Sequence, residues 1–192
     1  MAEEMKKLPE KKTPLALMKA ISDGLTGFMA YEARCGMAQA YNEYFLYGPI
    51  VRISNHREWR VESEWPHAKG NVNQVSRKGD HERIDFIFRS KSKDNDAGEQ
   101  WVALEVKWAG DKVSRLNVAK DVRKLQSAAA NFDGKNLKSF LLIVGRHSID
   151  KSGKPILQAK LTGLPDRQIV KYTSFFCTET AVKYGVTLYA IT

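Results

Sequence analysis

The sequence predicts a mixed α/β domain whose elements follow the order α, β, β, β, α, β. Two segments in the middle of the chain alternate apolar and polar residues, which is the pattern of strands with one buried face. Helical periodicity precedes and follows these segments, and a continuously apolar run comes after the second helical region. With 192 residues, of which 43% are hydrophobic, the chain is long enough to bury a core. We expect residues 1–13 to be a flexible charged tail and residues 14–192 to form a single domain.

The first elements of this domain are predicted to be helices. Thr13 and Pro14 are typical of a helix N-cap and of the first helical position. The Asp-Gly pair at 23–24 is expected to interrupt that helix. A second helix is expected over residues 25–45, because its apolar side chains recur at intervals close to 3.6 residues. The Gly-Pro pair at 48–49 is then expected to end it.

Strands are predicted in the next part of the chain. Residues 50–53 and 59–65 are expected to be strands around a polar turn, and residues 66–80 a polar loop that contains glycine. Residues 83–89 and 101–108 are the clearest strands, because their apolar side chains alternate with other types. The stretch between these two is polar and is typical of an exposed hairpin loop.

The remaining third of the chain is predicted to contain a helix and further strands. Residues 115–132 are expected to be helical, and their candidate core positions are Leu116, Val118, Val122, Leu125 and Ala129. The continuously apolar residues 140–144 indicate a strand that is buried on both faces. Residues 147–164 are expected to be a mixed loop region. Two apolar segments follow at 169–176 and 186–191, and the last is predicted to be a strand.

Composition limits the partners and the location that we expect. The chain has 31 Lys and Arg against 22 Asp and Glu, and its net charge of +9 favours an anionic partner such as nucleic acid, an acidic membrane surface or an acidic protein. No stretch approaches the ~20 apolar residues of a membrane span, and the charged start lacks the apolar segment of a secretory signal. Cys35 and Cys177 make neither a disulfide framework nor a zinc site. We therefore expect a cytoplasmic protein without a membrane partner.

Three charged residues lie where the strand pattern is most apolar. Asp85 is in the middle of one predicted strand, and Glu105 and Lys107 share one face of the next. Unpaired charge in such strands is costly, and a hairpin would bring Asp85 close to Glu105. Two neighbouring carboxylates repel each other unless one is protonated or a cation lies between them, and Mg²⁺ or Mn²⁺ satisfies both. The other interpretation is a salt-bridge cluster between the strands, or a site without activity.

Four short motifs follow one another through these elements. They are IDFIF at 84–88, LEVKW at 104–108, KDVRKL at 120–125 and SFLLIVG at 139–145. In this order the sequence resembles the PD-(D/E)xK phosphodiesterase superfamily, which includes many restriction endonucleases and repair nucleases. The resemblance covers about residues 38–145. It implies a restriction-endonuclease-like αβββαβ core, in which a mixed central sheet is flanked by helices.

The resemblance also implies roles for individual residues. Asp85 and Glu105 would hold Mg²⁺, for which Mn²⁺ can substitute, and Lys107 would position or polarise the attacking water. Glu43 matches a glutamate that many members carry on the helix before the first core strand, and it would assist at the metal. Glu64 resembles an additional acidic position of some subfamilies. Taken alone, Glu43 and Glu64 are equally typical of solvated surface residues.

The sequence therefore predicts a metal-dependent nuclease that hydrolyses phosphodiester bonds, with DNA favoured over RNA as its substrate. Basic residues on the elements around the proposed site are together candidate contacts to the nucleic-acid backbone: Arg57, Arg60, Lys69, Arg77, Lys78, Lys112, Arg115, Lys120, Arg123 and Lys124. Taken singly, each is more typical of a solvated surface charge. The alternative is a catalytically silent nuclease-like protein that binds nucleic acid or serves as a partner subunit. A domain that binds only proteins is the third interpretation. The oligomeric state stays open, because many nucleases of this type act as homodimers.

Overall fold

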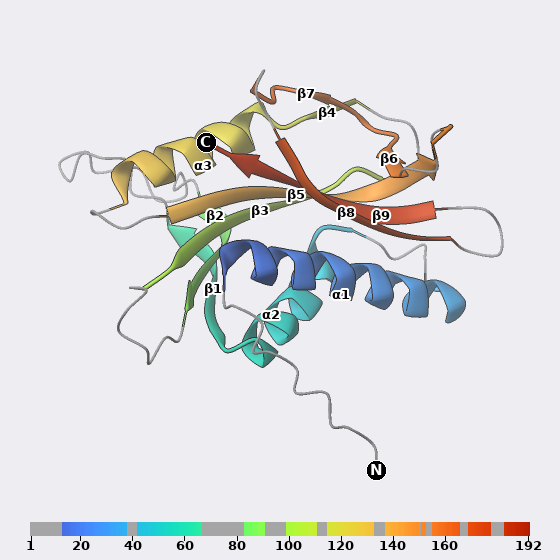
Figure 1. Cartoon of the computed structure of the whole chain (residues 1–192), viewed down its shortest axis with the longest axis horizontal. Helices are drawn as coiled ribbons and strands as arrows, with labels where there is room; N and C mark the ends of the chain where they lie inside the picture. The colour runs from blue at the N-terminus through green and yellow to red at the C-terminus, as the bar shows by residue number, and fades with distance from the viewer. Residues whose placement is uncertain are drawn as a thin grey trace, which may run out of the picture.

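A twisted β-sheet with helices on both faces forms the centre of the molecule (Figure 1). Helices α1 (Pro14–Arg34) and α2 (Tyr47–His56) cover one face, and α3 (Ala119–Asn131) covers the other. The structure is a computed structural model, and it describes residues 13–37, 42–66, 83–90, 99–110, 115–132, 137–149, 151–152, 155–165, 169–177 and 183–192. The predicted class, a mixed α/β domain, is confirmed.

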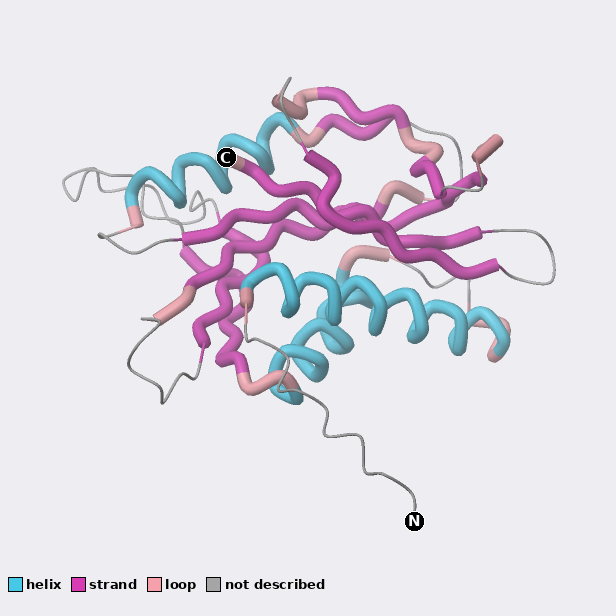
Figure 2. Tube along the Cα trace, in the orientation of Figure 1, coloured by secondary structure: helices cyan, strands magenta, loops and turns pink. Residues whose placement is uncertain are grey.

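Within the described residues the sheet contains seven strands and is mixed. Figure 2 shows its strands together with the helices around them. Its main path runs in the order β1-β2-β3-β5-β9-β8, and β6 pairs with β5. The strands are β1 (Trp59–Pro66), β2 (Arg83–Ser90), β3 (Trp101–Trp108), β5 (Leu137–Ile149), β6 (Pro155–Leu157), β8 (Ile169–Cys177) and β9 (Lys183–Ile191). Only the β3–β5 pair of this sheet is parallel among the described residues. Because parallel neighbours need a crossover, α3 connects β3 to β5 and lies across the sheet between them.

Two apolar clusters fill the spaces on either side of the sheet. Leu104 of β3 belongs to the cluster under α1 and α2, whereas Ala103 belongs to the cluster under α3. The alternation predicted for residues 101–108 is therefore confirmed. It follows that Glu105, which shares the face of Ala103, lies beneath α3.

Helix α1 begins as the sequence predicts but continues further than expected. The Thr13 hydroxyl accepts a hydrogen bond from the Ala16 amide at 3.2 Å, and Pro14 occupies the first turn. The interruption expected at 23–24 is wrong, because α1 is continuous to Arg34. A Cβ on Gly24 would lie 2.5 Å from Cδ1 of Ile53 in α2, so the glycine permits close packing of the two helices rather than ending α1.

The predictions for the next segment need correction. The helix expected over 25–45 ends at Arg34, and the short 3₁₀ helix η2 (Tyr44–Leu46) leads into α2. Residues 50–53, expected to be a strand, are helical, and the Gly-Pro pair at 48–49 lies in the first turn of α2, where proline is tolerated. The β-branched residues misled the prediction. In the fold Ile50 is buried against the core and Ser54 donates a hydrogen bond to its carbonyl at 2.7 Å.

Helix α3 and the later strands are of the predicted type, but they begin and end at other residues than predicted. Helix α3 begins at Ala119 rather than at 115, because Arg115–Asn117 forms strand β4, which pairs in parallel with β7 (Lys160–Thr162). Asn117 accepts a hydrogen bond from the Ala119 amide at 3.0 Å, which marks the start of the helix. Ala129 is exposed, and Ala128 takes its expected place in the core. The region 147–164, expected to be a loop, contains the end of β5 together with β6 and β7.

The strands predicted at 59–65, 83–89, 101–108, 140–144 and 186–191 are confirmed. The tail at 1–12, most of the polar loop at 66–80 and residues 91–98 of the hairpin loop lie outside the described residues. No helix in the described part of the chain is long and apolar enough to span a bilayer.

Candidate active site

The paired strands β2 and β3 bring Asp85 and Glu105 together. The paired part of their antiparallel register ends at Phe86 opposite Leu104, and Asp85 and Glu105 are the next residues beyond it on the two strands. There the Asp85 side chain takes the place of a backbone carbonyl, since its Oδ2 accepts a hydrogen bond from the Val106 amide at 2.8 Å. Asp85 is 8% exposed and Glu105 is 0% exposed. The juxtaposition of two carboxylates that the strand pattern predicts is confirmed.

Helix α3 adds two charged residues to this site. Asp121 and Lys124 are three residues apart and therefore share the helix face that lies on the sheet. The Lys124 Nζ lies 2.6 Å from Oε2 of Glu105, 2.9 Å from the carbonyl oxygen of Arg83 and 3.5 Å from Oδ1 of Asp121. Lys124, a candidate contact to a nucleic-acid backbone, is instead buried in the site, where its side chain is 10% exposed.

Lys107 joins the same group from the end of β3. Its Nζ lies 3.5 Å from Oδ1 of Asp121 and 3.5 Å from Oε1 of Glu43. Glu43 comes from the turn before η2, so the fold brings it to the strand residues although 62 positions separate it from Glu105. We call the assembly the carboxylate–lysine cluster. Its members are Glu43, Asp85, Glu105, Lys107, Asp121 and Lys124.

Burial controls the charge state of Glu105. The pKa of Glu105 is raised to about 8, chiefly by burial and then by the neighbouring charge of Asp85, while the ammonium of Lys124 opposes both effects. Oε2 of Glu105 is bonded to Lys124, but Oε1 is buried and has no hydrogen-bond partner among the described residues. A buried carboxylate oxygen without a partner is unfavourable, so it marks a place where a cation or a proton would be stabilised.

The two residues on the open side of the cluster also have shifted pKa values. Burial lowers the pKa of Lys107, but the charges of Asp121 and Glu43 outweigh it, and the net pKa is raised. Burial raises the pKa of Glu43, and Lys107 opposes the shift. The side chains of Lys107 and Glu43 are 23% and 31% exposed, respectively, so solvent reaches the cluster from their side. Lys107 is therefore a cation at neutral pH and faces the entrance.

Tyr47 is a member of the site that the sequence analysis missed. It lies in the first turn of α2, its ring packs edge-on against Phe86 at a centroid distance of 4.6 Å, and its hydroxyl interacts with the carboxylate of Asp85. Burial and the charge of Asp85 raise the pKa of Tyr47, so the hydroxyl stays protonated and acts as a donor. No local pattern marks Tyr47, because the Gly-Pro pair at 48–49 was expected to end a helix and residues 50–53 to form a strand.

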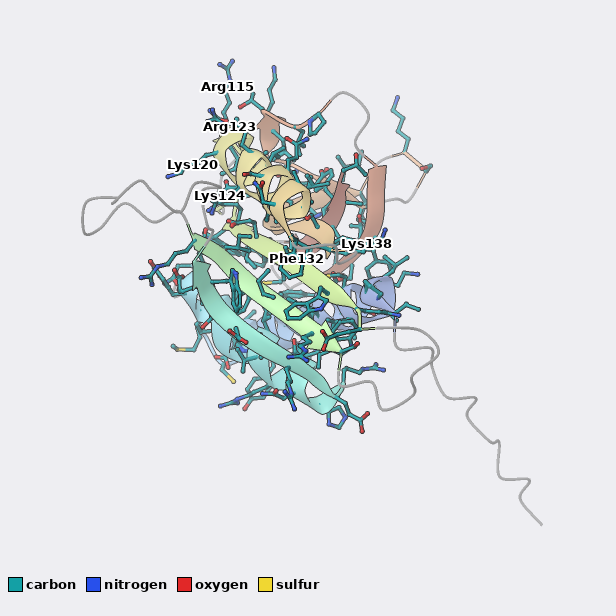
Figure 3. The ribbon with its side chains drawn as sticks, turned by 90° about the vertical axis from the view of Figure 1, so that its left-hand side faces the viewer. Arg115, Lys120, Arg123, Lys124, Phe132 and Lys138 are labelled. Carbon is teal, nitrogen blue, oxygen red and sulfur yellow. The ribbon has the colours of Figure 1, made fainter. Side chains whose placement is uncertain are left out.

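The other predicted site residues have different positions. Glu64 is exposed on β1, near enough to influence the pKa of Tyr47, and its φ of 54° is unusual for a residue that is not glycine. Arg115 and Lys120 are exposed at the start of the α3 region (Figure 3). Lys69, Arg77, Lys78 and Lys112 lie outside the described residues.

The donor atoms of the cluster decide which cation it could hold. Within the described residues, no group of three or more His, Cys, Asp or Glu side chains is arranged to hold a metal. Mg²⁺ is commonly held by one or two carboxylates, with water and substrate phosphate as its other ligands. Asp85 and Glu105 provide such a pair, and the unpartnered Oε1 of Glu105 is an open ligand atom. These two residues therefore fit the ion that the sequence implies.

The described architecture defines the class of the protein, a mixed α/β domain with a charged cluster buried between its sheet and one helix. A scan against protein-family models found no match, and searches of curated proteins and of solved structures found no significant match. What the protein does is therefore inferred from the chemistry of the cluster and its surroundings.

Proposed function

We propose that the protein is a metal-dependent nuclease that hydrolyses phosphodiester bonds, with DNA as its substrate. One observation carries the proposal. The buried carboxylates of Asp85 and Glu105 face each other, one of their oxygens has no partner, and the ammonium of Lys107 lies beside them at the solvent side. Phosphodiester hydrolysis requires an activated water and the neutralisation of negative charge that develops on the phosphate.

Asp85 and Glu105 would hold Mg²⁺ in this proposal. The bound ion would supply a lowered pKa for a coordinated water and positive charge for the phosphate. The hydrogen bond from the amide of Val106 would fix Oδ2 of Asp85 for this role. The ion would displace the proton that Glu105 retains because its pKa is raised. Tyr47 donates its hydroxyl to Asp85 and restricts its orientation further.

Lys107 and Glu43 would act on the substrate side. The pKa of Lys107 is raised, so its Nζ carries a proton at neutral pH and can donate to a water or to a phosphate oxygen. Glu43 and Asp121 lie on either side of this Nζ at 3.5 Å each and hold it at the entrance. Glu43, whose pKa is raised, can also accept a hydrogen bond from the attacking water.

A basic surface next to the cluster supports a nucleic-acid substrate. Arg115 of β4 and Lys120 and Arg123 of α3 are exposed, and Figure 3 shows all three above Lys124. The net charge of the chain is +9, which favours a polyanion. Phosphates of a strand bound along this side would therefore lie close to the cluster.

A nuclease-like protein that binds nucleic acid without cutting it is the second candidate. The observation that favours it is the short contact of Lys124 with Glu105, at 2.6 Å, because it already neutralises part of the charge that would hold a metal. In this alternative the exposed basic residues still bind nucleic acid, but no phosphodiester bond is cleaved.

A cleavage assay distinguishes the two functions. Plasmid DNA, linear single-stranded DNA and RNA are incubated with Mg²⁺, Mn²⁺ or EDTA and with the wild-type protein, Lys107→Ala or Lys138→Ala. Lys138 is an exposed lysine that pairs with Val102, about 17 Å along the strand direction from Lys107, and it is the matched control. We expect metal-dependent cutting by the wild type and by Lys138→Ala, and its loss in Lys107→Ala. Retained cutting by Lys107→Ala would refute the role of Lys107, and DNA binding by a folded wild type without any cutting would favour the silent alternative.

A further inference from the structure

We infer that the carboxylate–lysine cluster takes one divalent cation, and that Lys124 supplies a second positive charge as a fixed part of the protein. Phosphodiesterases operate with one ion or with two, and in a two-ion site a pair of metals lies between the carboxylates. The inference rests on the proposed function, because it concerns the ion that Asp85 and Glu105 would hold.

Lys124 is fixed in place by its contacts. An ammonium group has three donors, and three oxygens surround the Nζ of Lys124: Oε2 of Glu105 at 2.6 Å, the carbonyl of Arg83 at 2.9 Å and Oδ1 of Asp121 at 3.5 Å. The side chain is 10% exposed, so water has little access to replace these partners. Lys124 is therefore a built-in cation between Glu105 and Asp121, where a second metal would otherwise be held.

Lys107 occupies the other gap between carboxylates. Its Nζ lies between Glu43 and Asp121 at 3.5 Å from each. Oδ1 of Asp121 and Oε1 of Glu43 therefore each face an ammonium group. The pair that is left for a metal is Asp85 with Oε1 of Glu105.

The charge of the cluster leads to the same conclusion. Its four carboxylates, when ionised, and its two ammonium groups leave a net charge of two negative units within the described residues. One divalent ion neutralises this charge. A second divalent ion would leave two positive charges in a buried site, which is strongly unfavourable at low effective dielectric constant.

Lys124 consequently has a positioning role. It binds Oε2 of Glu105 and so leaves Oε1 as the oxygen available to the ion. Outer-shell groups of this kind set the orientation of a metal ligand. Lys124 does not need to contact the substrate for its loss to change the metal site.

The test is a Mn²⁺ titration of the full chain without nucleic acid. Isothermal calorimetry at about pH 8 measures the number of ions bound per chain, and electron paramagnetic resonance distinguishes an isolated Mn²⁺ from a coupled pair. We expect one ion per chain and the spectrum of isolated Mn²⁺. Two ions per chain would overturn the inference and leave the proposed function intact. No binding by the folded protein would overturn the proposed function itself.

Substitutions of Lys124 test whether its charge limits the site to one metal ion. Lys124→Met retains the length of the side chain and removes its charge, so we expect two Mn²⁺ per chain and a broadened spectrum that indicates a coupled pair. Lys124→Arg retains the charge and should bind one Mn²⁺, with an affinity within roughly tenfold of the wild type. Lys138→Met, a change at an exposed lysine of β5, should bind one ion as the wild type does.

Two outcomes would contradict the role of Lys124. One is a folded Lys124→Met variant that still binds a single Mn²⁺, and the other is a folded Lys124→Arg variant that binds two. Circular dichroism and the thermal midpoint of each variant show whether it is folded. If Lys124→Met does not fold, the wild-type stoichiometry and the charge-retaining Lys124→Arg variant decide the question.

Discussion

Replacing Glu105 by Gln should remove a pH dependence of stability that the wild-type protein has without metal. The folded protein retains the proton of Glu105 up to about pH 8, whereas the unfolded chain releases it near the ordinary carboxyl pKa of 4.5. Between these values the folded state binds more protons than the unfolded state. The free energy of unfolding must therefore fall as the pH rises from about 4.5 to about 8, and the stabilisation by the proton is complete only below this window.

The size of the effect follows from the burial of the carboxyl group. Glu105 is 0% exposed, so solvent screens its interactions little. One unit of pKa corresponds to about 1.36 kcal/mol, and a pKa near 8 in place of 4.5 thus amounts to on the order of 4–5 kcal/mol across the window. Glutamine has nearly the same shape and no proton to release in this range. The variant should lack this part of the pH dependence.

Urea unfolding in EDTA measures the effect. The unfolding free energies of the wild type and of Glu105→Gln are compared at about pH 5.5 and pH 8, and Glu62→Gln, a change at an exposed carboxylate on β1, is the control. We expect the wild type and the control to lose several kcal/mol more than Glu105→Gln over this range. Parallel pH curves for the wild type and Glu105→Gln would refute the reasoning, since any pH-independent effect of losing the contact to Lys124 cancels in this comparison.

Three other outcomes are expected. Changing both Lys120 and Arg123 to Ala should weaken DNA binding and reduce the steepness of log affinity against log salt by about 2, because each phosphate contact contributes roughly 0.9. Fluorescence titrations at several salt concentrations measure this slope. An unchanged slope would show that these two residues do not contact phosphates. Tyr47→Phe removes the donor to Asp85 and should lower the free energy of unfolding by about 1 kcal/mol in urea, whereas equal stability would indicate that the hydroxyl is not bonded. Mn²⁺ affinity in calorimetry should rise with pH up to about 8, because the proton on Glu105 competes with the ion, and a constant affinity between pH 6 and 8 would contradict this competition.

The alternating strands are the part of the site that can be predicted from the sequence. A period of two places Glu105 and Lys107 on one face, and antiparallel pairing brings Asp85 close to Glu105. These relations depend on local geometry alone. For that reason the expected juxtaposition of the two carboxylates agrees with the structure.

The orientation of α3 could not be predicted in the same way. Lys120, Arg123 and Lys124 are alike in a sequence, and solvent exposure is the usual state of a lysine or arginine. Only the rotation of the helix on the sheet exposes the first two and buries Lys124. Its burial is possible because oxygen atoms of Glu105, Arg83 and Asp121 surround its ammonium group.

Helix α2 shows how packing overrides local preference. The β-branched residues of 50–53 favour a strand, yet the segment is helical, because Ile50 is buried in the core and Gly24 permits α1 to approach closely. The position of Tyr47 depends on this helix. Its hydroxyl could not be assigned to the site before α2 was known.

The sequence by itself determined the α/β class, the strands around the cluster and the pairing of Asp85 with Glu105, because these follow from periods of two and 3.6 residues within short segments. Only the tertiary structure decided that Lys124, Asp121 and Glu43 complete the cluster and that Lys124 is buried. Their contacts join residues that are 14 to 64 positions apart, because α3 and the turn before η2 both reach the end of β3. The energy of a charged side chain depends on what surrounds it, and those surroundings exist only after the elements have packed.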